Sequence, residues 1–261
     1  MHNNESSQTD FAFYDLNGIA LIVGSPDRAV QMLGERVSNQ TEQTGGSVYF
    51  VNVHTWTLAQ ENQEFFDLLK RGTYCFPDGK PLVWAAHSRG AKTMARICGP
   101  DFMALFITRW GTKITSGCIG GHPGQVKQLS KNFGVKMTAY SPPHREFNVS
   151  NAHEDWSSFL SVFQNEHGGN SYPQVVWVCL GAPKQEQWID EIVKIAPKSI
   201  LFFGVGAALD FLAGTKTRAP KWMQNLGLEW LHRFVNEPSR LGRRYFETNM
   251  KFLKHISKTK R

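Results

Sequence analysis

The sequence lacks the patterns that mark several common classes of protein. No run approaches the ~18 uninterrupted apolar residues that cross a membrane, and residues 1–10 do not show the basic-then-apolar pattern of a secretion signal. The four cysteines, at positions 75, 98, 118 and 179, do not have the spacing of a zinc site. We therefore expect a cytoplasmic protein whose cysteines are buried free thiols.

Several catalytic signatures are also missing. The sequence has no Asp-x-Asp pair of the kind that binds Mg²⁺ or Mn²⁺ beside a nucleotide sugar, no G-x-S-x-G and no Walker lysine. Gly204 and Gly206 begin a G-x-G pattern, but position 209 is leucine, so the full dinucleotide motif is incomplete. We expect no metal ion and no cofactor. The two glycines still fit a tight loop that brings backbone close to a diphosphate.

The positive charge is concentrated at one end of the chain. The whole sequence has a formal charge of +7. Residues 218–261 contain eleven lysines and arginines against three acidic residues, a net charge of +8, which leaves −1 for residues 1–217. A nearly neutral body with a basic end predicts an anionic partner that binds at that end.

Short apolar runs alternate with longer mixed segments, which predicts an α/β layer fold. The expected strands are 19–23, 48–52, 113–119, 135–140, 174–180 and 199–203. The expected helices are 27–37, 57–70, 81–88, 101–110, 123–133, 155–164 and 184–195, followed by a basic helical region. The change of character near Thr217 predicts a core over residues 1–217 and an appendage over 218–261.

Two polar segments follow strand-like runs. Asn52-Val53-His54-Thr55 ends one run, and Phe76-Pro77-Asp78-Gly79-Lys80 follows another. Ligands of parallel α/β sheets bind at the carboxyl ends of the strands, so both segments would reach the same edge. The turn can point the Asp78 carboxylate into a cleft. An Asp-Gly pair is also typical of a turn that has no function.

A third segment, Leu180 to Glu186, runs from a strand into a helix. Gly181 permits close approach of a ligand, and Pro183 suits the first helical turn. The helix N-terminus offers N–H groups to a phosphate, and Lys184 and Gln185 add donors. A plain connection between strand and helix fits the same pattern.

Arginines alternate with aromatic residues beyond Thr217, and the planar guanidinium suits a diphosphate. From Arg240 to Ile256, apolar residues at helical spacing are flanked by basic ones, which predicts an amphipathic helix at a membrane surface. A terminal helix packed on the core with a solvated basic face is the alternative. An RNA-binding arm is a third interpretation, which the apolar residues at helical spacing disfavour.

Together these segments resemble the WecG/TagA/CpsF family of glycosyltransferases, in order and from about Leu16 to Leu253. The matching residues are Asn52-x-His54, Pro77-Asp78-Gly79, Arg96-x-x-Gly99-x-Asp101, Gly120-Gly121, Gly181-Ala182-Pro183-Lys184-Gln185-Glu186, Gly204-Val205-Gly206, Arg218-Ala219-Pro220-Lys221, Leu228-Glu229-Trp230-x-x-Arg233 and Pro238-x-Arg240.

The resemblance implies a Rossmann-like parallel sheet flanked by helices, with a basic helical appendage that meets the inner face of the cell membrane and completes the site. It implies an inverting, metal-independent enzyme that moves a hexose from a UDP-sugar to a polyprenyl-diphosphate-linked acceptor in bacterial surface polysaccharide or exopolysaccharide synthesis. A homo-oligomer is possible within the family, and no nucleic acid is expected as a partner.

The resemblance also assigns roles to residues. Asp78 matches the catalytic base, and Asn52 matches the asparagine of the sugar pocket. The expected substrate-binding residues are Asn52, His54, Gly79, Arg96, Asp101, Gly181, Lys184, Gln185, Glu186, Gly204, Gly206 and Arg218. The expected lipid-acceptor or membrane residues are Lys221, Arg233, Arg240, Arg243 and Arg244.

One departure from the family concerns the donor sugar. Many members have threonine two positions before the pocket asparagine, where this sequence has Phe50. The Asn-x-His form is more similar to members of the xanthan glucosyltransferase type, which favours UDP-glucose or a related hexose. The alternatives are UDP-N-acetylmannosamine, its uronic acid, and a non-catalytic protein that binds a nucleotide sugar or lipid.

Overall fold

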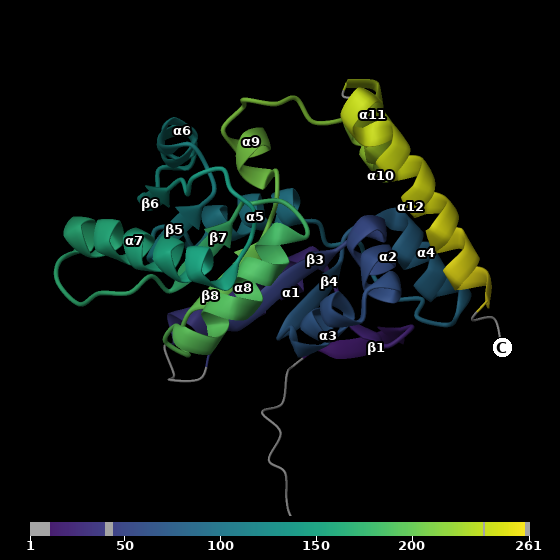
Figure 1. The fold of residues 1–261 in the computed structure, drawn as a ribbon, viewed down its shortest axis with the longest axis horizontal. Helices are drawn as coiled ribbons and strands as arrows, with labels where there is room; N and C mark the ends of the chain where they lie inside the picture. Colours follow the sequence, from purple (N-terminus) through teal and green to yellow (C-terminus); the bar gives the residue numbers. More distant parts are fainter. Residues whose placement is uncertain (1–10, 40–43, 237, 259–261) are drawn as a thin grey trace, which may run out of the picture.

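The computed structural model describes residues 11–39, 44–236 and 238–258. Its central element is a six-stranded sheet in the order β4-β3-β8-β7-β5-β6, in which every neighbouring pair is parallel. Helices cover both faces, so the predicted Rossmann-like α/β fold is confirmed (Figure 1). The sheet strands are β3 (Gly46–Val51), β4 (Tyr74–Pro77), β5 (Ser116–Ile119), β6 (Met137–Tyr140), β7 (Val175–Val178) and β8 (Leu201–Gly204).

Alternate residues of the strands build two apolar layers. In β3, Val48 and Phe50 face one side, whereas Tyr49 and Val51 face the other. Strand side chains alternate between faces, so a sheet covered on both sides is apolar at nearly every position. The helices that cover these faces are α1 (Pro26–Ser38), α3 (Gln63–Arg71), α5 (Gly99–Trp110), α6 (Pro123–Phe133), α7 (Val149–His167), α8 (Lys184–Ile195) and α9 (Ala208–Leu212).

The predicted strand at 19–23 forms, but it lies outside the main sheet. It is β2 (Ile19–Val23), which pairs antiparallel with β1 (Ala12–Leu16), a strand that we did not predict. Asn17 and Gly18 form the two-residue turn, with φ of 56° and 84°. Asn-Gly supplies the positive φ that a tight hairpin turn requires, so the sequence carries the signal of this hairpin.

The helix predicted over 57–70 is two helices, α2 (Val53–Glu61) and α3. The Asn62 side chain accepts a hydrogen bond from the Phe65 N–H at 2.8 Å and begins the second helix. Helix α2 begins at Val53, directly after β3, because Asn52 caps it in the same way. This early start places His54 in the first helical turn instead of in a loop.

The C-terminal segment is helical, as predicted, and packs on the rest of the protein. It contains α10 (Lys221–Asn225), α11 (Glu229–Asn236) and α12 (Pro238–Lys258). In Figure 1, α12 runs beside α2 and α4 (Lys80–Ser88). The Phe252 ring meets the Trp56 ring edge-on at 5.2 Å between centroids, and both side chains are buried. A domain boundary at residue 217 stays a prediction.

None of the described helices has the length and hydropathy needed to cross a membrane.

Candidate active site

A cavity of about 490 Å³ lies at the carboxyl ends of β4, β3, β8 and β7, which are neighbours in the sheet. The residues before position 218 that line it come from the ends of these strands, from the loops that follow them, from the first turns of the next helices and from the loop before α5: Phe50, Asn52, Val53, His54, Asp78, Gly79, Lys80, Pro81, Arg96, Cys98, Gly99, Pro100, Leu180, Gly181, Ala182, Lys184, Gln185, Gly204, Val205, Gly206 and Ala207. The C-terminal segment adds Gln224, Gly227, Glu229, Trp230, Thr248 and Asn249. The cavity is therefore closed on one side by the end of the chain.

Several helices begin at the wall of this cavity. Helices α4, α5 and α8 follow Gly79, Cys98 and Pro183, and none of the three has a side-chain cap among the described residues. The first N–H groups of an uncapped helix carry partial positive charge and lack partners within the helix. Several such helix starts around one cavity provide an environment that attracts an anion such as a diphosphate.

Asn52 has a local role that leaves part of its side chain for a ligand. Its Oδ1 accepts the N–H groups of His54 at 2.9 Å and Thr55 at 3.1 Å, which fixes the start of α2. Its amide nitrogen makes no hydrogen bond with the described part of the chain. The capping bond orients the amide, so the nitrogen can donate to an oxygen of a bound molecule.

Asp78 lines the cavity from the end of β4. Its backbone N–H donates to the Val51 carbonyl at 2.7 Å, which ties the turn to β3, the neighbouring strand. The Asp78 side chain is 23% exposed, and its Oδ1 lies 3.8 Å from the Arg96 Nη2. A partly buried carboxylate at a cavity wall can accept a proton from a bound hydroxyl group.

A series of ion pairs links the Asp78 carboxylate to the C-terminal segment. Arg96 donates to Glu229 at 2.7 Å, and the Arg218 Nε donates to the same carboxylate at 3.0 Å. Arg218 also donates through its Nη2 to Asp101 at 3.0 Å. The two arginines are therefore held by carboxylates from both parts of the chain.

These contacts shift the protonation of the groups involved. Burial works to raise the pKa of Asp101, but the hydrogen bonds from Arg218 and from the Cys98 thiol outweigh it and hold the pKa at about 2. Burial works to lower the pKa of Arg96, yet Cys98, Asp78 and Glu229 raise it above its ordinary value. Asp101 and Arg96 therefore stay ionised across the physiological pH range.

Gln185 connects α8 to the loop after β8. Its Nε2 donates to the Gly204 carbonyl at 3.2 Å and to the Glu186 Oε1 at 2.9 Å, and its Oε1 accepts the Gly206 N–H at 2.9 Å. Both amide hydrogens are thus used within the protein. Lys184 likewise donates to the Arg145 carbonyl at 2.7 Å. Gln185 lines the cavity mainly as a support for the 204–206 loop.

Glu186 is a buried carboxyl group that accepts a hydrogen bond from Gln185. Its side chain is removed from solvent, and Oε2 has no hydrogen-bond partner among the described residues. Burial raises the pKa of Glu186 to about 7, against which the Gln185 hydrogen bond works only in part. The group is therefore close to half protonated at neutral pH.

Glu186→Gln is expected to stabilise the protein above pH 7 and to change little near pH 4.5. The pKa of Glu186 in the folded protein lies above its ordinary value of 4.5. The wild type therefore loses stability as the pH rises from 4.5 towards 7 and the buried side chain ionises, whereas the uncharged amide of E186Q loses none. A shift of this size corresponds to about 3 kcal/mol of unfolding free energy. Urea unfolding at pH 4.5 and pH 8 measures the difference, with the exposed Glu154→Gln as control. If the unfolding free energies of wild type and E186Q depended equally on pH, the raised pKa of Glu186 would be contradicted.

The structure brings most of the predicted substrate residues together. Ten residues predicted as catalytic or substrate-binding line the cavity: Asn52, His54, Asp78, Gly79, Arg96, Gly181, Lys184, Gln185, Gly204 and Gly206. Asp101, Glu186, Arg218 and Lys221 are not among the lining residues: Asp101 and Arg218 form an ion pair, Glu186 is buried, and Lys221 is exposed on α10. The side chains of Arg233, Arg240, Arg243 and Arg244 lie outside the described residues.

Some cavity residues were not predicted as part of the site. Lys80 and Cys98 are adjacent to predicted residues, so their sequence positions alone could have indicated them. Glu229 and Trp230 lie in a segment that matches the family, but we assigned no role to them. Thr248 and Asn249 lie on α12 and carry no local signal, because only the packing of α12 brings them to the cavity.

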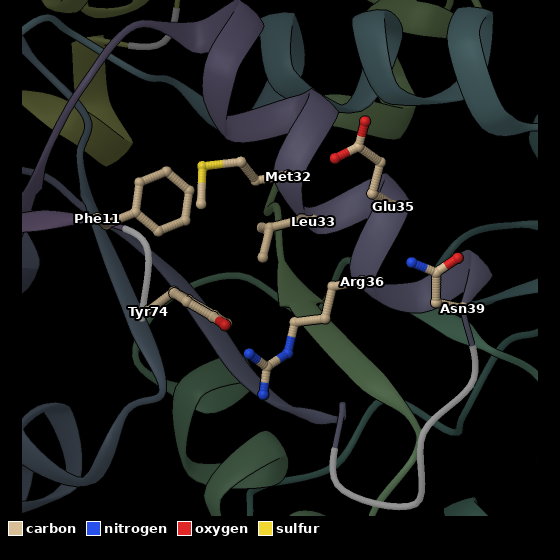
Figure 2. A pocket seen from close by; sticks show the side chains of 7 residues that line it. All are labelled: Phe11, Met32, Leu33, Glu35, Arg36, Asn39 and Tyr74. Atoms are coloured by element: carbon tan, nitrogen blue, oxygen red, sulfur yellow. The ribbon is translucent and has the colours of Figure 1, made fainter. Parts of the chain in front are cut away.

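A smaller cavity of about 230 Å³ lies elsewhere, at the amino end of β4. Figure 2 shows Met32, Leu33 and Arg36 of α1 around it, together with Phe11 and Tyr74. The Arg36 Nε donates to the Thr44 carbonyl at 3.1 Å. None of the predicted site residues lines this cavity. It lies on the side of the sheet where α/β proteins do not usually bind ligands.

Residues 14–261 match the family described as "Glycosyl transferase WecG/TagA/CpsF family". The match includes the core, the loops around the larger cavity and the C-terminal segment.

Proposed function

The chain belongs to the WecG/TagA/CpsF family of glycosyl transferases, and from this premise we propose an inverting transfer of a hexose from a UDP-sugar to a polyprenyl-diphosphate-linked sugar. The observation that supports it best is the position of Asp78, whose carboxylate lines a cavity surrounded by uncapped helix starts. The product would serve bacterial surface polysaccharide or exopolysaccharide synthesis.

Asp78 acts as the general base in this proposal. Its carboxylate accepts the proton of the acceptor hydroxyl while that oxygen attacks the anomeric carbon of the donor. The bond from that carbon to UDP breaks on the opposite side, so the configuration of the sugar inverts. Arg96 lies 3.8 Å from Asp78, close enough to favour the carboxylate form that this step requires but too far to hold it in a hydrogen bond.

The leaving UDP gains negative charge on its outer phosphate. The N–H groups of Gly99 at the start of α5 and of Lys184 at the start of α8 offer donors where this charge develops, and Lys80 adds a cation at the same cavity. Donors that are already in place stabilise a developing charge without reorganisation. The 204–206 loop, held by Gln185, lets backbone approach the diphosphate closely.

UDP-glucose is the donor that we propose. Phe50, which replaces the threonine of many family members, lines the cavity and stacks on Phe76 with 5.6 Å between ring centroids. A rigid aromatic wall provides apolar contact but no hydrogen bond for an N-acetyl group. The test is incubation of radiolabelled UDP-sugars with a short polyprenyl-diphosphate-sugar. Transfer from UDP-glucose with inversion supports the proposal, whereas transfer from UDP-N-acetylmannosamine alone would contradict the choice of donor.

The C-terminal segment is the proposed contact with the anionic inner face of the cell membrane. Its described helices expose large apolar side chains, namely Trp222, Leu226, Trp230, Val235, Met250 and Leu253. Trp84 of α4 is also exposed and lies next to the segment at Gly227. Apolar side chains combined with a net charge of +8 suit an anionic bilayer, which would hold the lipid-linked acceptor near the cavity.

Transfer is expected to continue in excess EDTA, with less than a twofold loss of rate. The cavity supplies positive charge from side chains and helix starts, and the sequence has no Asp-x-Asp pair. The measurement compares initial rates with EDTA and after addition of Mg²⁺ or Mn²⁺. A loss of more than about tenfold that Mg²⁺ restores, equal to roughly 1.4 kcal/mol of barrier, would contradict metal independence.

A further inference from the structure

Glu229, at the start of α11, holds two arginines with a single carboxylate. Its Oε2 accepts from Arg96 at 2.7 Å and its Oε1 accepts from Arg218 at 3.0 Å. All three side chains are between 15% and 17% exposed. The contact joins residues that are 133 positions apart and ties the C-terminal segment to the cavity wall.

Arg96 has two carboxylates within reach and lies closer to one of them. Its Nη2 is 2.7 Å from Glu229 but 3.8 Å from Asp78, which is too long for a hydrogen bond. Among the described residues that line the cavity, Asp78 and Glu229 are the two carboxylates. They therefore compete for the same guanidinium, and Glu229 has the shorter contact.

The charged and ionisable groups around Asp78 come from each neighbouring element. These groups are His54 of α2, Lys80 of α4, Arg96 and Cys98 before α5, Lys184 of α8 and Glu229 of α11. Arg218 and Asp101, which are not among the lining residues, form an ion pair with each other. Lys184 is bound to the Arg145 carbonyl. Among these lining side chains, Glu229 is the negative group that balances the cations next to Asp78.

We propose that Glu229 is a positioning residue, which keeps Arg96 away from Asp78 and so preserves the strength of Asp78 as a base. A carboxylate in a short ion pair holds its charge more tightly and takes a proton less readily. Without Glu229, Arg96 would move toward Asp78, and a nearby negative charge would also be lost. Both changes weaken the base. This inference rests on the proposed function, in which Asp78 accepts the proton.

The proposal links the C-terminal segment to the chemistry of the core. Glu229 lies on the segment that carries the exposed apolar side chains, whereas Asp78 and Arg96 belong to the core. When α11 is in place, Arg96 is drawn to Glu229 instead of Asp78, and Asp78 keeps its strength as a base toward the acceptor. When α11 moves away, Arg96 turns to Asp78 and the base is weakened. Transfer therefore depends on a docked segment.

The test uses the full chain and Glu229→Gln. The acid limb of the kcat/KM profile is expected to move about one pH unit lower, and kcat at pH 8 to fall about three- to tenfold. KM for the donor is expected to stay within twofold. Glu61→Gln is the matched control, because it removes the 2.8 Å ion pair with Lys251 between α2 and α12 but touches neither Arg96 nor Asp78. It should leave the profile unchanged.

A second readout separates this inference from the proposed function. The carboxyl carbon of Asp78, assigned by comparison with D78N, is titrated by NMR in wild type and E229Q, which requires no activity. A midpoint about one unit lower in E229Q supports the inference even if no donor is turned over. An unchanged midpoint overturns it even if transfer occurs. If E229Q does not fold, Glu229→Asp is used, whose shorter carboxylate should give a smaller shift in the same direction. No shift in folded E229D would overturn the proposal.

Discussion

Asp78→Asn is expected to lower the transfer rate by about 10³-fold while leaving the affinity for UDP within about threefold. An amide cannot accept the proton of the acceptor hydroxyl, and a positioned general base contributes about 10²- to 10⁴-fold. The diphosphate contacts come from other residues, namely the helix starts and Lys80. Initial rates measure the first effect, and isothermal titration with UDP measures the second.

The control for this prediction is Asp67→Asn. Asp67 lies on α3, where it accepts a hydrogen bond from Gln63 within the same helix, outside the cavity. This substitution removes a negative charge of the same size and should leave both rate and affinity unchanged. Unchanged turnover in D78N would end the role of Asp78 as the base. A loss of UDP binding in D78N would instead show that the carboxylate supports the shape of the cavity.

Removal of the chain after Thr217 is expected to abolish both binding to anionic liposomes and transfer. The truncation deletes a net charge of +8 and the exposed apolar side chains of α10 to α12. Each basic residue near an anionic surface contributes about 1 kcal/mol to binding. The truncation also deletes the part of the cavity wall that includes Glu229 and Trp230. A truncated protein with full activity would contradict the idea that the segment completes the site.

A finer variant separates membrane binding from folding, because the truncation also uncovers the buried Trp56 ring. Trp222→Ser combined with Leu226→Ser changes two exposed side chains on and next to α10. Liposome binding should fall at least about tenfold, since both side chains would lose burial in the bilayer. UDP binding should stay the same. The matched control, Tyr172→Ser with Ile195→Ser, changes exposed apolar residues outside the segment and should leave liposome binding intact.

Strands and helices that depend on residues close together in sequence were the easier part of the fold to predict. Buried parallel strands are continuous apolar runs, and five of the predicted strands lie in the main sheet. Strand β4 was not predicted as such, because Pro77 ends its apolar run after Tyr74, Cys75 and Phe76. The hairpin was missed although Asn17-Gly18 carries its signal. Helices α2 and α3 were merged because the apolar spacing continues past Asn62.

The site residues likewise divide into those that local sequence predicts and those that only tertiary packing brings to the cavity. Asp78 and Asn52 could be found because each directly follows a strand, and parallel strands bring such residues to one edge. Glu229, Thr248 and Asn249 could not, since their place depends on how α11 and α12 pack against loops far away in sequence. Sequence also favoured Arg218 as a contact to the leaving diphosphate. In the structure Arg218 is not among the lining residues and is bound to Asp101 and Glu229, so its contact with the diphosphate stays a prediction.

The most direct test of the central claim is a crystal structure of the protein with UDP. The account predicts UDP in the larger cavity, with its diphosphate against the Gly99 N–H of α5 and the Lys184 N–H of α8 and its outer phosphate on the side of Asp78. UDP bound in the smaller cavity beside Arg36, or in the larger cavity with its diphosphate away from Asp78, would contradict it.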